Sequence, residues 1–79
     1  MPTIHLTYAI DYQGQHITEL QLRRPKVRDQ LNADKQGGSN GEKEVTIFAN
    51  LCDVAPDVIH ELDMADYSQL QTSYRGFLS

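Results

Sequence analysis

The sequence contains a single cysteine, Cys52, among its 79 residues. A disulfide within the chain is therefore impossible, and one unpaired thiol fits a reducing compartment. A chain of this length buries only about 60–65 % of its unfolded surface, so we expect its stability to be marginal. Small chains without disulfides or metals are often stabilised by a partner or by self-association. This is a first indication of a binding protein.

The sequence also lacks long apolar runs and an excess of positive charge. Its apolar runs reach about three residues, whereas roughly 20 are needed to span a bilayer. Residues 1–5 show no basic region followed by an apolar stretch, so we expect no signal peptide and a cytoplasmic protein. The chain has 11 acidic and 7 basic residues, with a net charge of −4. Because general nucleic-acid binders are usually basic, this balance argues against that class.

The first third of the chain predicts an antiparallel β-hairpin. Apolar and polar residues alternate over residues 3–10, which is typical of a half-buried strand. A turn containing Gly14 follows, and a second strand is expected from about His16 to Arg24. The register that gathers the apolar side chains on one face pairs Leu6 with Leu20 and Ile4 with Leu22. Since a lone hairpin is unstable, its apolar face must lie on helices.

Pro25 marks a change in the periodicity of apolar residues from two to about 3.6, which predicts helices in the rest of the chain. The first helix is expected from about Lys26 to Gln36, with Val27 and Leu31 on its apolar side. Three glycines then fall within the segment Gly37–Gly41. We expect this segment to be a mobile break between helices.

Three further helical segments are predicted after this break. Asn40 is the expected cap of a helix from about Glu42 to Val54, and Pro56–Leu62 forms a short helical turn. Asp63 has the character of an N-cap for the last helix, with Asp66 close to a capping-box position. A hairpin followed by three or four short helices gives an α+β fold. We expect one domain over the whole chain.

No constellation of residues predicts catalysis, a cofactor or a metal site. His5 and His16 lie in neighbouring strands, but the expected register does not pair them, and no ligand set surrounds them. Cys52 falls on the apolar face of a helix and is interpreted as a small buried hydrophobe. The glycine-rich segment Gly37–Gly41 lacks the Lys and Ser/Thr of a Walker loop. We therefore expect no enzyme.

One basic cluster places four positive charges in six residues: Arg23, Arg24, Lys26 and Arg28. The favoured interpretation is the solvated exit of a strand, with contact to an acidic protein as a second possibility. The alternative function kept open is a small nucleic-acid-binding regulator that uses Arg23–Arg28. Salt-dependent retention on DNA or RNA would favour that alternative.

Two short motifs stand out once the elements are in order: Leu22-Arg23-Arg24-Pro25, and Leu62-Asp63 followed by Asp66-Tyr67 and Leu70. With the order of elements from Ile17 to Ser79, they resemble the tail assembly chaperones of Mu-like contractile-tailed phages and prophages. Neither motif is a catalytic signature. Two departures are Lys26, where a Thr-like cap is more usual, and Ala55, where Ser or Thr often caps the Pro-led turn.

The resemblance implies a role in phage assembly. Such chaperones bind the tape measure protein, the long helical chain that sets tail length, and keep it soluble until tail tube subunits assemble around it. The tail tube protein is a further expected partner. The expected location is the cytoplasm of the bacterial host, with no copy in the mature virion. A structural part of the tail that stays in the particle is a third alternative.

The apolar faces of the second and last helices are wider than the hairpin requires, which predicts an interaction site. Its candidate residues are Phe48, Leu51, Tyr74, Phe77 and Leu78, with Arg23 and Arg24 from the basic cluster. A helical client presents apolar side chains that such a surface can bind. The alternative is that these apolar residues are core. Weak self-association is also expected.

Overall fold

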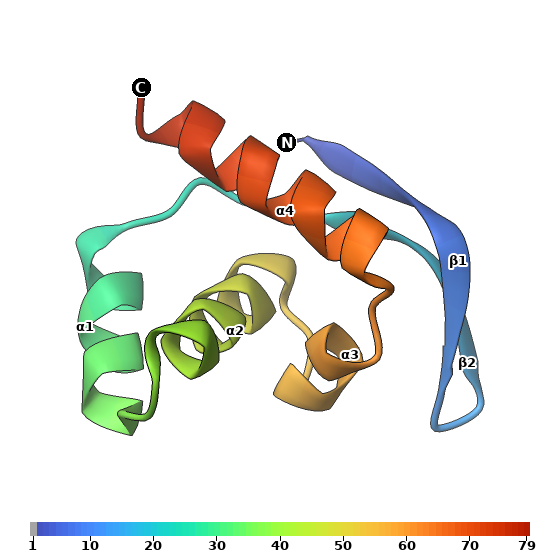
Figure 1. Ribbon diagram of the computed structural model, residues 1–79, viewed down its shortest axis with the longest axis horizontal. Coiled ribbons are helices and arrows are strands. Elements are labelled where there is room, and N and C mark those ends of the chain that lie inside the picture. The colour runs from blue at the N-terminus through green and yellow to red at the C-terminus, as the bar shows by residue number, and fades with distance from the viewer. Residues whose placement is uncertain (1) are drawn as a thin grey trace.

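The computed structural model describes residues 2–79, which form an antiparallel hairpin followed by four helices (Figure 1). The elements are β1 (Thr3–Tyr12), β2 (Gln15–Gln21), α1 (Val27–Gln36), α2 (Asn40–Cys52), α3 (Pro56–His60) and α4 (Met64–Phe77). The predicted α+β class and element order are therefore confirmed. In Figure 1, α1, α2 and α3 lie in a row, and α4 crosses one side of them, beginning near α3 and the hairpin and ending on the side of α1.

The hairpin closes at Gln13 and Gly14, which both have positive φ, as a two-residue turn between twisted strands requires. The predicted register is wrong, because Ile4 faces Leu20 rather than Leu22. The ladder shifts between His5 and Ile10, where residues 6–9 of β1 lie opposite the single residue Thr18 of β2. This irregularity is a β-bulge. It turns part of β1 away from its partner strand.

The strand β2 also ends earlier than expected, at Gln21 rather than Arg24. The amide of Leu22 still donates to the carbonyl of Pro2 at 3.0 Å. The next amide, that of Arg23, donates at 3.1 Å to the carbonyl of Leu51 in α2. The chain therefore leaves the hairpin and attaches to the carboxyl end of α2.

The core lies between the hairpin, α2, α3 and α4. Phe48 is fully buried, with its ring 5.5 Å from the Tyr67 ring and 5.4 Å from the Tyr74 ring, measured between centroids. Tilted and edge-on pairs of this kind add to the energy of apolar burial. The buried apolar residues are Ile4, Ile10, Leu20, Leu22, Ala33, Ile47, Phe48, Ala49, Leu51, Val58, Ile59, Leu62 and Leu70.

The orientation of α1 differs from the prediction. Val27 is 77 % exposed and Leu31 is 62 % exposed, whereas Asp29 and Ala33 point inward. Lys26 stands at the N-cap position and provides no side-chain cap, since an ammonium group has no acceptor. The helix is instead oriented by Asp29, whose contacts are described below.

The two longest helices begin with side-chain caps. Ser39, and not the predicted Asn40, caps α2, because its hydroxyl accepts from the amide of Glu42 at 3.2 Å. The Glu42 carboxylate accepts in return from the Ser39 amide at 3.1 Å, which completes a capping box. Asp63 caps α4 as predicted, accepting from the amide of Ala65 at 2.9 Å. The expected mobility of Gly37–Gly41 stays a prediction.

Candidate partner-binding surface

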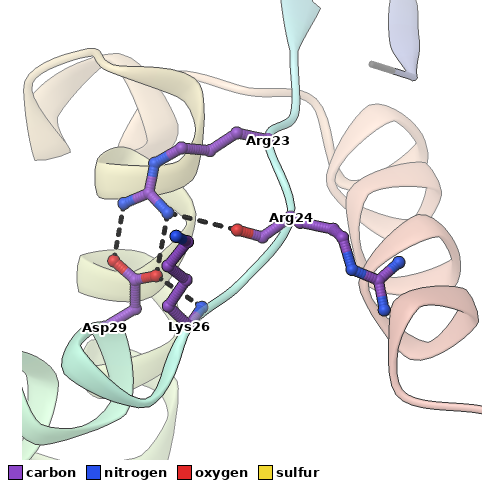
Figure 2. A network of polar contacts seen from close by, with 4 residues as sticks. All are labelled: Arg23, Arg24, Lys26 and Asp29. Carbon is purple, nitrogen blue, oxygen red and sulfur yellow. Dashed lines mark hydrogen bonds and ion pairs between the residues drawn. The ribbon is translucent and has the colours of Figure 1, made fainter.

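The junction between β2 and α1 is held by a bidentate ion pair (Figure 2). The Arg23 guanidinium donates to the Asp29 carboxylate through Nη2 at 2.6 Å and Nη1 at 2.9 Å. The same carboxylate accepts from the backbone amide of Lys26 at 2.8 Å. Asp29 is buried, and the hydrogen bonds from Arg23 hold the pKa of its carboxyl below the ordinary value. The pair fixes the first turn of α1 against the exit of the hairpin.

Arg24 points in the opposite direction, towards α4 (Figure 2). Its guanidinium carbon lies 5.5 Å from the centroid of the Phe77 ring, within cation–π range. Its Nη2 also donates to the Phe77 carbonyl at 3.4 Å. Two of the four cations of the basic cluster therefore have partners within the chain. Only Lys26 and Arg28 remain for the nucleic-acid alternative, which these contacts weaken.

Asp66 is the second buried carboxylate, and its hydrogen-bond partners differ from those that the sequence predicts. It was expected near a capping-box position, yet it is fully buried and points at the β1 bulge. Its Oδ1 accepts from the amide of Thr7 at 2.9 Å, and its Oδ2 accepts from the amide of Tyr8 at 3.1 Å. The bulge leaves these amides without strand partners, and Asp66 satisfies them. The Asp66-Tyr67 motif is therefore a structural joint between α4 and β1.

A third contact joins α4 to α2. The Tyr67 hydroxyl donates to Oε1 of Glu44 at 2.6 Å, and Nε2 of Gln71 donates to the same oxygen at 2.8 Å. Burial, followed by the bond to Glu44, raises the pKa of the Tyr67 hydroxyl above its ordinary value. Tyr67 therefore stays protonated and acts as a donor. The first half of α4 is therefore held to α2 by Tyr67 and to β1 by Asp66.

The predicted partner residues fall into two groups. Phe48 and Leu51 lie in the core, as the alternative interpretation of these residues required. Tyr74 and Phe77 are half-buried, and Leu78 is 64 % exposed at the end of α4. The large hydrophobic residues that are exposed are Tyr8, Val27, Leu31, Met64 and Leu78.

The histidines and the cysteine form no joint site. The imidazole Nδ1 atoms of His5, His16 and His60 each lie near one carboxylate, at 3.5, 2.7 and 3.7 Å respectively. Within residues 2–79, no group of three or more potential ligands is placed to hold a metal ion. Burial raises the pKa of the Cys52 thiol to about 11, so the unreactive thiol is the dominant form at neutral pH. No helix among the described residues has the length and apolar character to cross a membrane.

The structure is a small α+β fold. Buried carboxylates hold α1 and α4 to the hairpin, and apolar side chains at helix ends are exposed to solvent. The sequence model of one protein family, described as phage tail assembly chaperone proteins, E, or 41 or 14, matches residues 3–79. The chain therefore belongs to this family, as the resemblance implied, and the family is not one of enzymes. No curated protein and no solved structure matches the chain.

Proposed function

We propose that the chain binds the helical tape measure protein and keeps it soluble until the tail tube assembles. Membership of the tail assembly chaperone family supports a protein partner in tail assembly. The observation that carries the proposal is the apolar carboxyl-terminal end of α4. We define the α4 tip as Arg24, Tyr74, Phe77 and Leu78.

The α4 tip combines ordered and exposed side chains. Tyr74 packs on the buried Phe48 ring, and Phe77 lies under the Arg24 guanidinium. Leu78 projects beyond them with most of its surface in solvent. Because Tyr74 and Phe77 are already held, binding a client loses less side-chain entropy than ordering free aromatic residues would. Phe48 and Leu51 are left out of the proposed contact because they support it from within the core.

This arrangement suits an amphipathic helix. A client helix presents apolar side chains at i, i+3, i+4 and i+7, and these can cover Leu78 and the exposed part of Phe77. The aromatic residue is the expected anchor, since aromatic and arginine residues dominate binding energy at protein interfaces. Arg24 lies at the rim, where its charge favours an acidic flank on the client. The tail tube protein is a second candidate partner for the same tip.

The test is co-expression with the tape measure protein of the same phage. We expect the wild-type chain to raise the soluble fraction of the tape measure protein and to co-purify with it. Leu78→Lys should reduce co-purification at least about tenfold with an unchanged melting temperature, because Leu78 is exposed. The matched control is Tyr8→Lys, an exposed residue near the opposite end of α4. A tape measure protein that co-purifies equally with both variants would overturn the assignment of the α4 tip.

The place of action follows from the same proposal. A chaperone that acts before the tube closes works in the host cytoplasm and leaves the assembling tail. We therefore expect the chain in infected-cell lysates and not in purified virions. Mass spectrometry of both fractions distinguishes this role from that of a structural tail component, because a stoichiometric amount in virions would support the latter.

A further inference from the structure

The structure has a second apolar surface, which is formed by residues other than those of the α4 tip. A hollow of about 430 Å³ opens between the start of α2, α3 and the start of α4. Its apolar lining is Val45, Ile59, Leu62, Met64 and Tyr67. Met64 is 77 % exposed at its edge. We call this hollow the α3 groove.

The rim of the α3 groove is acidic. Glu42 lines the hollow, and Asp57 lies 3.7 Å from the ring of the lining residue His60. Glu61 and Asp63 flank the lining residue Leu62 in the chain, and both are exposed. An apolar hollow with such a rim selects a partner that is both apolar and basic.

The exposed side of α1 has that chemistry. Val27 and Leu31 are one helical turn apart, so they lie on the same face, and both are largely exposed. Five of the seven basic residues of the protein fall within residues 23–35, and three of these are exposed on α1 or next to its start: Lys26, Arg28 and Lys35. Of the other two, Arg24 belongs to the α4 tip and Arg23 is neutralised by Asp29. The exposed acid of this helix, Asp34, lies 3.7 Å from Lys43 of α2. We call this surface the α1 face.

We infer that the α1 face of one copy docks in the α3 groove of a second copy. The two surfaces are different, so the contact is heterologous and leaves one free α1 face and one free groove on every pair. Association can therefore continue beyond a dimer, as a ring or an open chain. Opposite charges at the rim make the contact weaken with added salt. This assigns the expected self-association to surfaces other than the α4 tip, and it does not depend on the client.

The test uses two exposed positions, one on each surface. Leu31→Glu places an acid on the α1 face, and Met64→Lys places a cation in the α3 groove. Each variant alone should associate at least about tenfold more weakly than wild type in analytical ultracentrifugation, with an unchanged melting temperature. The wild-type average mass should keep rising with concentration past that of a dimer, and should fall as salt is added.

Mixing the two variants gives the decisive result. The Leu31→Glu chain keeps an intact α3 groove, and the Met64→Lys chain keeps an intact α1 face, so the mixture should form heterodimers although neither variant self-associates. The control Leu78→Lys should associate as wild type does. Three results would each overturn the inference: a monomeric wild type at high concentration, a mixture that stays monomeric, or association lost in Leu78→Lys and kept in the two test variants.

Discussion

Two buried aspartates determine how the hairpin and the helices fit together. Asp29 accepts from Arg23 and the Lys26 amide, and Asp66 accepts from two amides of the β1 bulge. A buried carboxylate is tolerated only when its oxygens are satisfied. Within residues 2–79, no buried side-chain nitrogen or oxygen lacks a hydrogen-bond partner. Each aspartate therefore converts an irregular stretch of backbone into a fixed joint.

The first prediction concerns Asp66. Asp66→Asn keeps the size of the side chain but replaces one acceptor oxygen with an amide donor that faces a backbone N–H. We expect a loss of about 2–3 kcal/mol in the free energy of unfolding, and a melting temperature lower by roughly 10–20 °C. Thermal and urea denaturation measure both.

Asp63→Asn is the matched control on the same helix. Asn caps helices as well as Asp does, so we expect a cost below about 0.5 kcal/mol. Equal costs for the two substitutions would mean that Asp66 does not hold the bulge. In that case the registers of β1 and β2 would need another explanation.

The second prediction concerns the pH dependence contributed by Arg23 and Asp29. The pKa of Asp29 is lowered in the folded chain, so the pair stabilises the fold above the ordinary carboxyl pKa near about 4. This contribution is lost as the pH falls through the lowered folded pKa. The pKa of Arg23 is raised, so its own titration lies above the working range. Arg23→Gln should cost about 2 kcal/mol near pH 7, and the difference from wild type should shrink below roughly pH 4.

Urea denaturation of both proteins from pH 7 to pH 3 measures that difference, and the other carboxylates cancel because both proteins contain them. Arg24→Gln is the matched control, because the Arg24 guanidinium lies over the Phe77 ring and, within residues 2–79, forms no ion pair with a carboxylate. We expect Arg24→Gln to cost about 0.5–1 kcal/mol with little dependence on pH. A difference for Arg23→Gln that stays constant down to pH 3 would argue against the ion pair.

At the scale of elements, the sequence predicted what depends on neighbouring residues and missed what depends on distant ones. The change of period at Pro25, the short helix at Pro56 and the cap at Asp63 were visible because local chemistry determines each of them. The β1 bulge was missed because its amides are satisfied by Asp66, which lies 58 and 59 residues further along the chain. An alternating pattern of apolar and polar residues predicts a regular strand register. It gives no sign of a distant side chain that can satisfy the amides of a bulge.

The face of α1 was missed for a related reason. Apolar spacing alone put Val27 and Leu31 inside, yet the bidentate bond from Arg23 pulls Asp29 inward. Residues two positions apart lie on opposite sides of a helix, so Val27 and Leu31 face solvent when Asp29 faces inward. Only the structure divided the candidate partner residues into buried and exposed ones. A row of apolar residues on a helix does not reveal which of them a second helix covers.

The third prediction concerns the start of α2. Ser39→Ala removes the hydroxyl that accepts from the Glu42 amide, so we expect a loss of about 1 kcal/mol in the free energy of unfolding. Faster hydrogen exchange should be confined to the first turn of α2. Asn40→Ala is the control and should change stability by less than about 0.5 kcal/mol. The opposite ranking of the two variants would restore Asn40 as the cap.

At the scale of the whole molecule, charge and stability are both unevenly distributed. Positive charge gathers around α1, and negative charge gathers from α2 to the start of α4. The small core is closed by polar joints rather than by disulfides, since Cys52 is the only cysteine. A domain of this size is marginally stable alone, so a bound partner can raise its stability by a large fraction.

The last prediction uses this marginal stability to map the client. Overlapping peptides of the tape measure protein are added to the wild-type chain, and the melting temperature is recorded for each. A peptide that binds only the folded chain, at a concentration 100 times its Kd, stabilises it by about 2.7 kcal/mol. That corresponds to a shift of roughly 10–20 °C for a domain of this size. The same peptide should give little shift with Leu78→Lys and the full shift with Tyr8→Lys. A full shift with Leu78→Lys would place the client elsewhere on the chain, and the Met64→Lys variant would then show whether the α3 groove is the site. Wild-type protein that no peptide stabilises, while whole tape measure protein also fails to co-purify with it, would refute tape measure binding itself.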